Sequence, residues 1–219
     1  MNYFSEQEIR DIVAQVIASA GLGGAPEEQK IPVEISARHV HLTREDMDIL
    51  FGEGSQLTPK RDLSQPGQFL SEERVKLVTT RGELTNVAIL GPLRARTQVE
   101  VSMTDARILG VKAPVCMSGD LEGAADVIIV GPKGVVTSHE SVIAAKAHVH
   151  MLPKDAEDYH VTDGEHVSIR LAGERSITLN DVIVRVSDRS RLAVHIDFDE
   201  ANAAQVSGGE IEGYLIKHR

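Results

Sequence analysis

The tripeptide His-Val-His occurs twice in this chain, at residues 39–41 and again at residues 148–150. Side chains of an extended strand alternate between its two faces, so both histidines of each copy project to the same side. The intervening Val40 or Val149 then points the opposite way, into apolar packing. Two imidazoles on one face can bind a single metal ion, so each copy predicts a strand with a metal-binding face.

The surrounding sequence indicates that the two copies belong to an internal duplication. An aspartate, Asp46 or Asp155, stands seven residues after the first histidine of each copy. A second pair of segments further along the chain also aligns, and it sets Glu100 opposite His195. Each half thus offers three side chains that can bind a metal, which leaves a coordination position open for catalysis. The expected ligands are His39, His41 and Glu100 for one site and His148, His150 and His195 for the other.

The composition restricts the kinds of partner that the chain can have. Of its 219 residues 42% are hydrophobic, which is enough for one or two small domains with buried cores. The formal net charge of −10 argues against a general binder of nucleic acid or of anionic membranes, because both need a basic surface. The single cysteine, Cys116, excludes an intrachain disulfide. Because we find neither a membrane-spanning run nor a secretory signal, we expect a cytoplasmic protein.

The first 30 residues predict a separate amphipathic helix followed by a linker. Ser5 and Glu8 form a capping-box pattern, and apolar residues recur at intervals of three and four over residues 4–20. The segment that follows, up to residue 30, is polar and contains several glycines, as a flexible tether does. Such a helix either folds back onto its own domain or docks on another protein, and the sequence leaves both alternatives open.

From residue 31 onward the sequence predicts many short strands and few helices, a spacing that favours small β-barrels capped by helices. We expect strands over residues 31–35, 75–80, 84–90, 98–103, 125–130, 147–151, 166–171, 177–186, 192–196 and 212–216. We expect helices over residues 44–51, 103–109, 140–146 and 200–205. Only 3% of the residues are aromatic, so valine, isoleucine, leucine and alanine must build the cores. The expected fold class is mainly β.

Two residues outside the metal pattern are candidates for anion binding. Arg94 follows the Gly91-Pro92 turn, where its guanidinium can give a bidentate contact to phosphate. Judged from the residues alone, a solvated loop arginine is the more common case. Ser118 precedes Gly119 in a turn, where its hydroxyl can either donate to an anion or cap the loop.

A series of short motifs runs along the chain and covers residues 31–216. The motifs are Ser36-Ala37-Arg38-His39-Val40-His41-Leu42, Gln65-Pro66-Gly67-Gln68, Leu90-Gly91-Pro92-Leu93-Arg94, Thr104-Asp105-Ala106-Arg107, Met117-Ser118-Gly119, His148-Val149-His150-Met151, and His195-Ile196-Asp197 followed by Asp199-Glu200-Ala201-Asn202. In content and in order they resemble the phosphate propanoyltransferases of the propanediol-utilisation type. The resemblance implies two β-barrels with short helical caps and an active site between them. Residues 31–37 with 146–219 would form the first barrel, and residues 38–145 the second barrel, inserted into it.

The resemblance also implies transfer of a short acyl group, propanoyl or acetyl, between coenzyme A and inorganic phosphate at a site with two zinc ions. The family's first zinc site matches His39, His41 and Glu100, and its second matches His148, His150 and His195, in agreement with the duplication. Arg94 matches the phosphate-binding arginine, and Ser118 is a second contact to phosphate. Imidazole and carboxylate ligands suit cobalt or iron as well as zinc.

The positions that contact coenzyme A in the family match Ile35, Ser36, Ala37, Arg81 and Asn202. One position departs from the pattern, because Ala88 stands where the resemblance leads us to expect an arginine. The phosphates of coenzyme A are then held less tightly, or by Arg61 and Arg81.

Neither Cys116 nor the order of serine, histidine and aspartate residues suggests a covalent acyl-enzyme, so we expect direct transfer. Two alternatives stay open. A binuclear metal hydrolase of a thioester or phosphate ester would use a bridging hydroxide in place of phosphate. In a non-catalytic protein, the metals would be structural clips across the two barrels.

The N-terminal helix also gains an interpretation from the resemblance. Similar enzymes of bacterial microcompartments carry amphipathic terminal extensions that direct them into the protein shell. We therefore expect residues 4–20 to act as an encapsulation peptide that binds the shell, with self-association as the competing role. We also expect a homo-oligomer.

Overall fold

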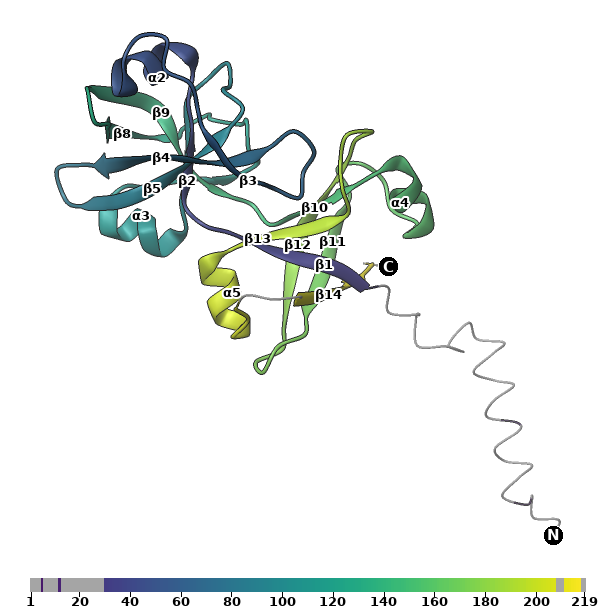
Figure 1. The fold of residues 1–219 in the computed structure, drawn as a ribbon. Helices are drawn as coiled ribbons and strands as arrows, with labels where there is room; N and C mark the ends of the chain where they lie inside the picture. The colour runs from purple at the N-terminus through teal and green to yellow at the C-terminus, as the bar shows by residue number, and fades with distance from the viewer. Residues whose placement is uncertain (1–4, 6–11, 13–29, 208–210, 218–219) are drawn as a thin grey trace.

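The computed structural model of the chain describes residues 5, 12, 30–207 and 211–217. The predicted N-terminal helix and most of its linker lie outside these residues. Within them the chain forms two β-barrels with short helices at their edges (Figure 1). The expected fold class, mainly β with helical caps, is confirmed. No helix in the described part of the chain is long and apolar enough to cross a membrane.

The first barrel is closed, with the strand order β1-β13-β10-β12-β11-β14. Its strands are β1 (Lys30–Ser36), β10 (His148–Met151), β11 (His166–Leu171), β12 (Ile177–Val186), β13 (Ala193–Asp197) and β14 (Ile211–Ile216). Two helices belong to this part of the chain, α4 (Pro153–Asp158) and α5 (Phe198–Ala204). The pairs β1–β13 and β10–β12 are parallel, and the other neighbours around the ring are antiparallel.

The second barrel contains β2 (His39–His41), β3 (Pro59–Asp62), β4 (Phe69–Val78), β5 (Glu83–Gly91), β6 (Gln98–Glu100), β7 (Val115–Cys116), β8 (Ala125–Val130) and β9 (Val135–Ala145). Its helices are α2 (Arg44–Phe51) and α3 (Met103–Leu109). Strand β8 pairs with both β4 and β9, and so closes the ring β4-β5-β2-β6-β9-β8. Strands β3 and β7 extend the sheet beyond this ring.

The chain crosses between the two barrels twice. It leaves the first barrel after β1 through Ala37 and Arg38, and it returns to β10 through Lys146 and Ala147. Strands β2 to β9, which form the second barrel, therefore lie between two strands of the first barrel in the sequence. Each crossing directly precedes a His-Val-His segment, so both segments begin at the junction of the barrels.

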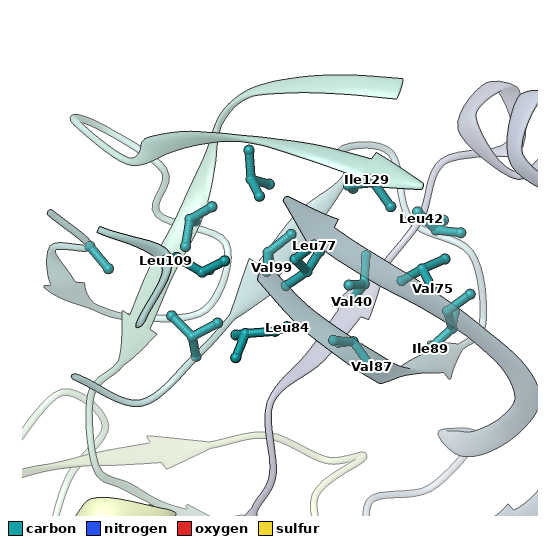
Figure 2. Packing of buried hydrophobic residues seen from close by; sticks show 14 of the residues in the cluster. Val40, Leu42, Val75, Leu77, Leu84, Val87, Ile89, Val99, Leu109 and Ile129 are labelled. Atoms are coloured by element: carbon teal, nitrogen blue, oxygen red, sulfur yellow. The ribbon is translucent and has the colours of Figure 1, made fainter. Parts of the chain in front are cut away.

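The valine of each His-Val-His segment anchors its strand in a separate apolar core. Val40 is fully buried in one core, which it shares with Val75, Ile89 and Val99 (Figure 2). Val149 is fully buried in the other core. Because alternate residues of a strand face opposite sides, burial of each valine turns its two neighbouring histidines away from the core.

The two aspartates that the duplication aligned both lie in the first turn of a helix. Asp46 is the third residue of α2, and its backbone N–H donates to the hydroxyl of the capping residue Thr43. Asp155 is the third residue of α4, and its carboxylate accepts from the backbone N–H of Leu152. Each His-Val-His strand is thus followed by a helix with a stabilised first turn, and this explains the repeated spacing.

The predicted helix over residues 140–146 is wrong, because this segment continues strand β9. Residues 141–144 are all buried, and β9 pairs with β8, β6 and β7. The Ala-Ala-Lys composition favours a helix locally, but pairing on both sides decides the structure. Helix α4 and strands β3 and β7 were not expected, and β4 begins at residue 69 instead of 75. The helix expected at 200–205 begins two residues earlier, at Phe198.

Glu200 gives the stability of the fold a pH dependence that can be tested. Burial, together with the charges of Asp197 and Asp199, raises the pKa of Glu200 to about 7 from an ordinary value of 4.5. Between these pH values the folded protein holds a proton that the unfolded chain has lost, so this group makes stability fall as pH rises from about 4.5 to 7. We expect Glu200→Gln to remove this loss and to gain about 2 kcal/mol over the original chain at pH 8 but not at pH 4.

Urea unfolding of both proteins at pH 4 and pH 8 measures the difference. Glutamine keeps the side-chain oxygen that accepts from the backbone N–H of Asp197, so the helix cap is preserved. An equal change in unfolding free energy between the two pH values for both proteins would contradict the assignment to Glu200.

Candidate active site

Strand register brings the three predicted ligands of each metal site together. Strand β2 pairs antiparallel with β6 and sets His39 opposite Glu100. Strand β10 pairs antiparallel with β13 and sets His148 opposite His195. Directly opposed residues point to the same face of a sheet, so the third ligand joins the two histidines of its barrel. In each group the ligand atoms all lie within 4.8 Å of one another.

The distances within the two groups fit a metal ion. Ligand atoms bound to a tetrahedral zinc at about 2.0–2.2 Å lie about 3.4 Å apart. The Nε2 atoms of His148 and His150 are 3.2 Å apart. His39 Nε2 and Glu100 Oε2 are 3.5 Å apart. Both sets of side chains can therefore converge on one cation without large rearrangement.

Backbone carbonyl groups orient the histidines. His39 Nδ1 lies 2.8 Å from the carbonyl oxygen of Ala37, and His148 Nδ1 lies 2.8 Å from that of Lys146. His41 Nδ1 contacts the carbonyl oxygen of Leu90 at 3.2 Å. A proton held on Nδ1 by a carbonyl leaves the Nε2 lone pair available, which is the usual arrangement around a metal.

Electrostatics keep these side chains in the form that binds metals. Burial, with the nearby His39, lowers the pKa of His41 to about 3. Burial likewise lowers the pKa of His150 to about 3 and that of His148 to about 4. Burial alone would raise the pKa of Glu100, but His39 and His41 lower it to about 2. At neutral pH the imidazoles of His41, His148 and His150 are therefore neutral, and the Glu100 carboxylate is charged.

Both groups face a single cavity of about 680 Å³, which is lined by residues of both barrels. The cavity is also lined by Arg94, Ser118, Ile35, Ser36 and Ala37, all of which the sequence predicted as site residues. It does not include the other two predicted coenzyme A contacts, Arg81 and Asn202, which lie exposed elsewhere on the surface. The structure thus brings most of the predicted site residues together in one place, but not Arg81 and Asn202. The role assigned to each of these residues stays a prediction.

A hydrogen-bond network links the phosphate-binding candidate Arg94 to the first metal group. Arg94 Nη1 donates to the Ser118 hydroxyl at 3.2 Å. Gln98 Nε2 donates to Ser118 Oγ at 2.9 Å and to Glu100 Oε1 at 2.5 Å. Gly119 N donates to Gln98 Oε1, which holds the loop against strand β6. The guanidinium is therefore positioned beside the metal group by buried polar contacts.

Arg185 is a candidate site residue that the sequence reasoning missed. It pairs with His150 in the β10–β12 register and lines the cavity. Burial lowers the pKa of Arg94, and the charge of Arg185 adds to this effect, so the two guanidinium groups lie near each other. The only signal in the sequence is a charged residue inside the apolar strand Val182-Ile183-Val184-Arg185-Val186. One arginine comes from each barrel.

Two further arginines line the cavity near Ala88. Strand β4 sets Arg74 opposite Ala88 in the register with β5, and Arg61 lines the same cavity. Arg74 Nη1 donates to the carbonyl oxygens of Ser71 at 2.5 Å and of Glu73 at 2.7 Å. The wall around the small Ala88 side chain therefore still carries positive charge.

The loop between β3 and β4 forms hydrogen bonds that connect the second barrel to the first. Gln65 is 5% exposed, and its side-chain amide donates to the carbonyl oxygen of Arg191 and accepts from the Arg191 N–H. Ser64 Oγ donates to Glu34 Oε2 at 2.5 Å. These contacts hold one wall of the cavity between the barrels.

Comparisons with known proteins place the chain in one family. The family model described as phosphate propanoyltransferase matches residues 32–207. A phosphate propanoyltransferase of Alkaliphilus metalliredigens is 48% identical over 213 residues, which are 97% of this chain and 99% of the relative. One of Clostridioides difficile is 47% identical over 212 residues, again 97% of this chain and 99% of the relative. One of Thermotoga maritima is 48% identical over 192 residues, 87% of this chain and 91% of the relative.

The match extends over both barrels and includes every residue that faces the cavity from the two metal groups. Identity near one half over almost the full length of several relatives is far more than a shared fold requires. The chain therefore belongs to the phosphate propanoyltransferase family, whose members are acyltransferases.

Proposed function

We propose that this protein transfers a short acyl group, propanoyl or acetyl, from coenzyme A to inorganic phosphate, and the reverse, at a dinuclear zinc site between its barrels. The observation that carries the proposal is that two metal-binding groups and two arginines face one cavity in a member of this family. The products would be the acyl phosphate and free coenzyme A, with no acyl group left on the protein.

The first metal would be held by His39, His41 and Glu100, and the second by His148, His150 and His195. Zinc in such sites, or cobalt or iron with the same ligands, supplies a Lewis acid for the thioester oxygen and a favourable environment for the departing sulfur. Three protein ligands leave room for a substrate atom at each centre.

Inorganic phosphate is a weak nucleophile and carries about two negative charges at neutral pH. Its reaction with a thioester therefore requires groups that orient it and offset its charge. Arg94 and Arg185 would bind it from opposite barrels through bidentate contacts and offset its charge. A phosphate oxygen then attacks the thioester carbonyl carbon. A carbon–oxygen bond forms, the carbon–sulfur bond breaks, and coenzyme A leaves as its thiolate.

The protein offers poor groups for a covalent acyl intermediate. Burial raises the pKa of the Cys116 thiol, with the charge of Asp120 adding to the effect. A thiol with a raised pKa is protonated at neutral pH and is a weak nucleophile. This supports direct transfer between the two substrates.

Coenzyme A would lie along Ile35, Ser36 and Ala37, which line the cavity at the end of β1. Its phosphates need cations, and Arg61 and Arg74 supply them beside Ala88. This pair can therefore replace the arginine that we expected at position 88.

A first experiment measures the release of coenzyme A from propanoyl-CoA and from acetyl-CoA with and without phosphate. We expect release to depend on phosphate. We expect Arg94→Lys and Arg185→Lys to raise the KM for phosphate about tenfold to a hundredfold, because lysine keeps the charge but loses the bidentate contact. Arg189→Lys, an exposed arginine beyond the cavity, is the matched control. Release that continues at full rate without phosphate would favour the binuclear hydrolase.

A second experiment counts the metals. Elemental analysis should find two metal ions per chain, and one ion in His41→Ala or His150→Ala, each of which loses its coenzyme A release. His166→Ala changes an exposed histidine outside the cavity and should keep both ions. Thermal unfolding of the chelator-treated protein should stay cooperative. Unfolding on removal of metal would instead support metals as structural clips.

We also propose that residues 4–20 direct the enzyme into a bacterial microcompartment by binding the shell. The amphipathic pattern of this segment and its polar tether support the proposal. Deletion of residues 1–24 should leave the rate of coenzyme A release unchanged and abolish co-purification with shell proteins. Unchanged shell association would contradict the proposal, and a lower molecular mass in light scattering would favour the self-association role.

A further inference from the structure

Gln98 joins the carboxylate of the first metal group to the loop that carries Ser118, yet it belongs to neither metal group and does not line the cavity. The β2–β6 register sets Gln98 opposite His41, so its side chain lies on the same face as the histidines. Only 2% of Gln98 is exposed. A buried amide needs partners for its polar atoms, so the hydrogen bonds of Gln98 fix its side chain.

Both ends of the Gln98 amide are bonded. Its Nε2 donates to Glu100 Oε1 at 2.5 Å and to Ser118 Oγ at 2.9 Å, while its Oε1 accepts from the Gly119 N–H at 2.8 Å. The other carboxylate oxygen, Glu100 Oε2, is the one that lies 3.5 Å from His39 Nε2. Gln98 therefore occupies Oε1 of the carboxylate and leaves Oε2, beside the imidazole, for a metal ion.

The same contacts orient the Ser118 hydroxyl. Its oxygen accepts from Gln98 Nε2 and from Arg94 Nη1, and a hydroxyl has two acceptor positions and one proton. Because both acceptor positions are filled, the proton is left for a third group, either Glu100 or an anion in the cavity that Ser118 lines. Burial raises the pKa of Glu100, the two imidazoles of its group lower it, and a hydrogen bond from the Ser118 hydroxyl lowers it further.

The first barrel indicates that the fold alone does not require an amide at this position. Strand β13 corresponds to β6 in the duplication, and Ala193 corresponds to Gln98. Ala193 stands opposite the second histidine of its His-Val-His segment, as Gln98 does in the other barrel. Ala193 is also buried, with 1% of its surface exposed. A strand pair of this kind thus forms around an alanine, so strand pairing does not explain the three polar contacts of Gln98.

We propose that Gln98 is a positioning residue that couples the first metal centre to the phosphate-binding side of the cavity. It holds the Glu100 carboxylate in the orientation that binds the metal. Through Ser118 it also fixes the Arg94 guanidinium and directs the hydroxyl proton. The inference rests on the proposed function and deepens it, because it makes metal affinity and phosphate affinity depend on one buried amide.

A first measurement separates the two metal centres. His150→Ala is expected to keep only the first centre and His41→Ala only the second, so Gln98→Met is added to each. The affinity for Co²⁺, measured by competition with a chelator, should fall about tenfold to a hundredfold in the His150→Ala chain. It should stay unchanged in the His41→Ala chain. An equal loss at both centres would show general damage to the structure and would overturn the proposal.

A second measurement uses the chain with both centres loaded. Gln98→Met should raise the KM for phosphate about fivefold or more and leave the KM for propanoyl-CoA within about twofold, because the lost contacts orient the phosphate-binding groups. In a Ser118→Ala background Gln98→Met should add no further increase, since its effect on phosphate passes through that hydroxyl. Gln56→Met, at an exposed glutamine beyond the cavity, is the matched control and should change neither KM.

A further variant keeps the test valid if Gln98→Met does not fold. Gln98→Asn retains a buried amide that is one methylene shorter, and it should shift both readouts in the same direction. Unchanged Co²⁺ affinity at the first centre, or equal rises in both KM values, would overturn the role of Gln98 alone. If the original chain releases coenzyme A at full rate without phosphate, the proposed function fails, and the coupling to phosphate fails with it.

Discussion

The antiparallel pairing of a His-Val-His strand with one neighbour is the interaction on which the rest of the site depends. In each barrel a fully buried valine fixes which face of the strand is apolar, and the histidines on either side of it must turn toward the cavity. The opposed strand then supplies the third donor, Glu100 in one barrel and His195 in the other. A shift of register by one residue would move these donors into the core, so the metal geometry and the packing of the core are specified together.

The two barrels share the arrangement of their His-Val-His strands but differ in the side chains that they present to the cavity. Both place a capped helix after the His-Val-His strand, and both hold the first histidine through a carbonyl group of the preceding crossing. The cavity walls nevertheless differ, because Arg94 comes from the second barrel and Arg185 from the first, at positions that are not equivalent. An approximately symmetric frame therefore carries two unlike groups of potential metal ligands and an asymmetric pair of arginines.

Much of the site followed from local spacing in the sequence, since the two histidine pairs and their third partners are fixed by strand alternation and duplication. Residues that depend on contacts between distant segments could not be found in that way. Glu34 and Arg185 approach the metal groups only through the register of parallel strands, and Gln65 acts only because its loop reaches the other barrel. The helix wrongly expected at residues 140–146 has the same origin, because pairing with three strands overrides the helical preference of an alanine-rich segment.

The two short crossings between the barrels have a consequence for how the enzyme can move and evolve. The carbonyl groups of Ala37 and Lys146, which orient His39 and His148, belong to these crossings. A hinge rotation of one barrel against the other would therefore turn two imidazoles of the candidate metal groups at once. An insertion at either crossing would also displace the carbonyl group that orients the histidine after it. In many multidomain enzymes such a joint is free to bend, but here it carries the carbonyl groups that orient two imidazoles of the candidate site.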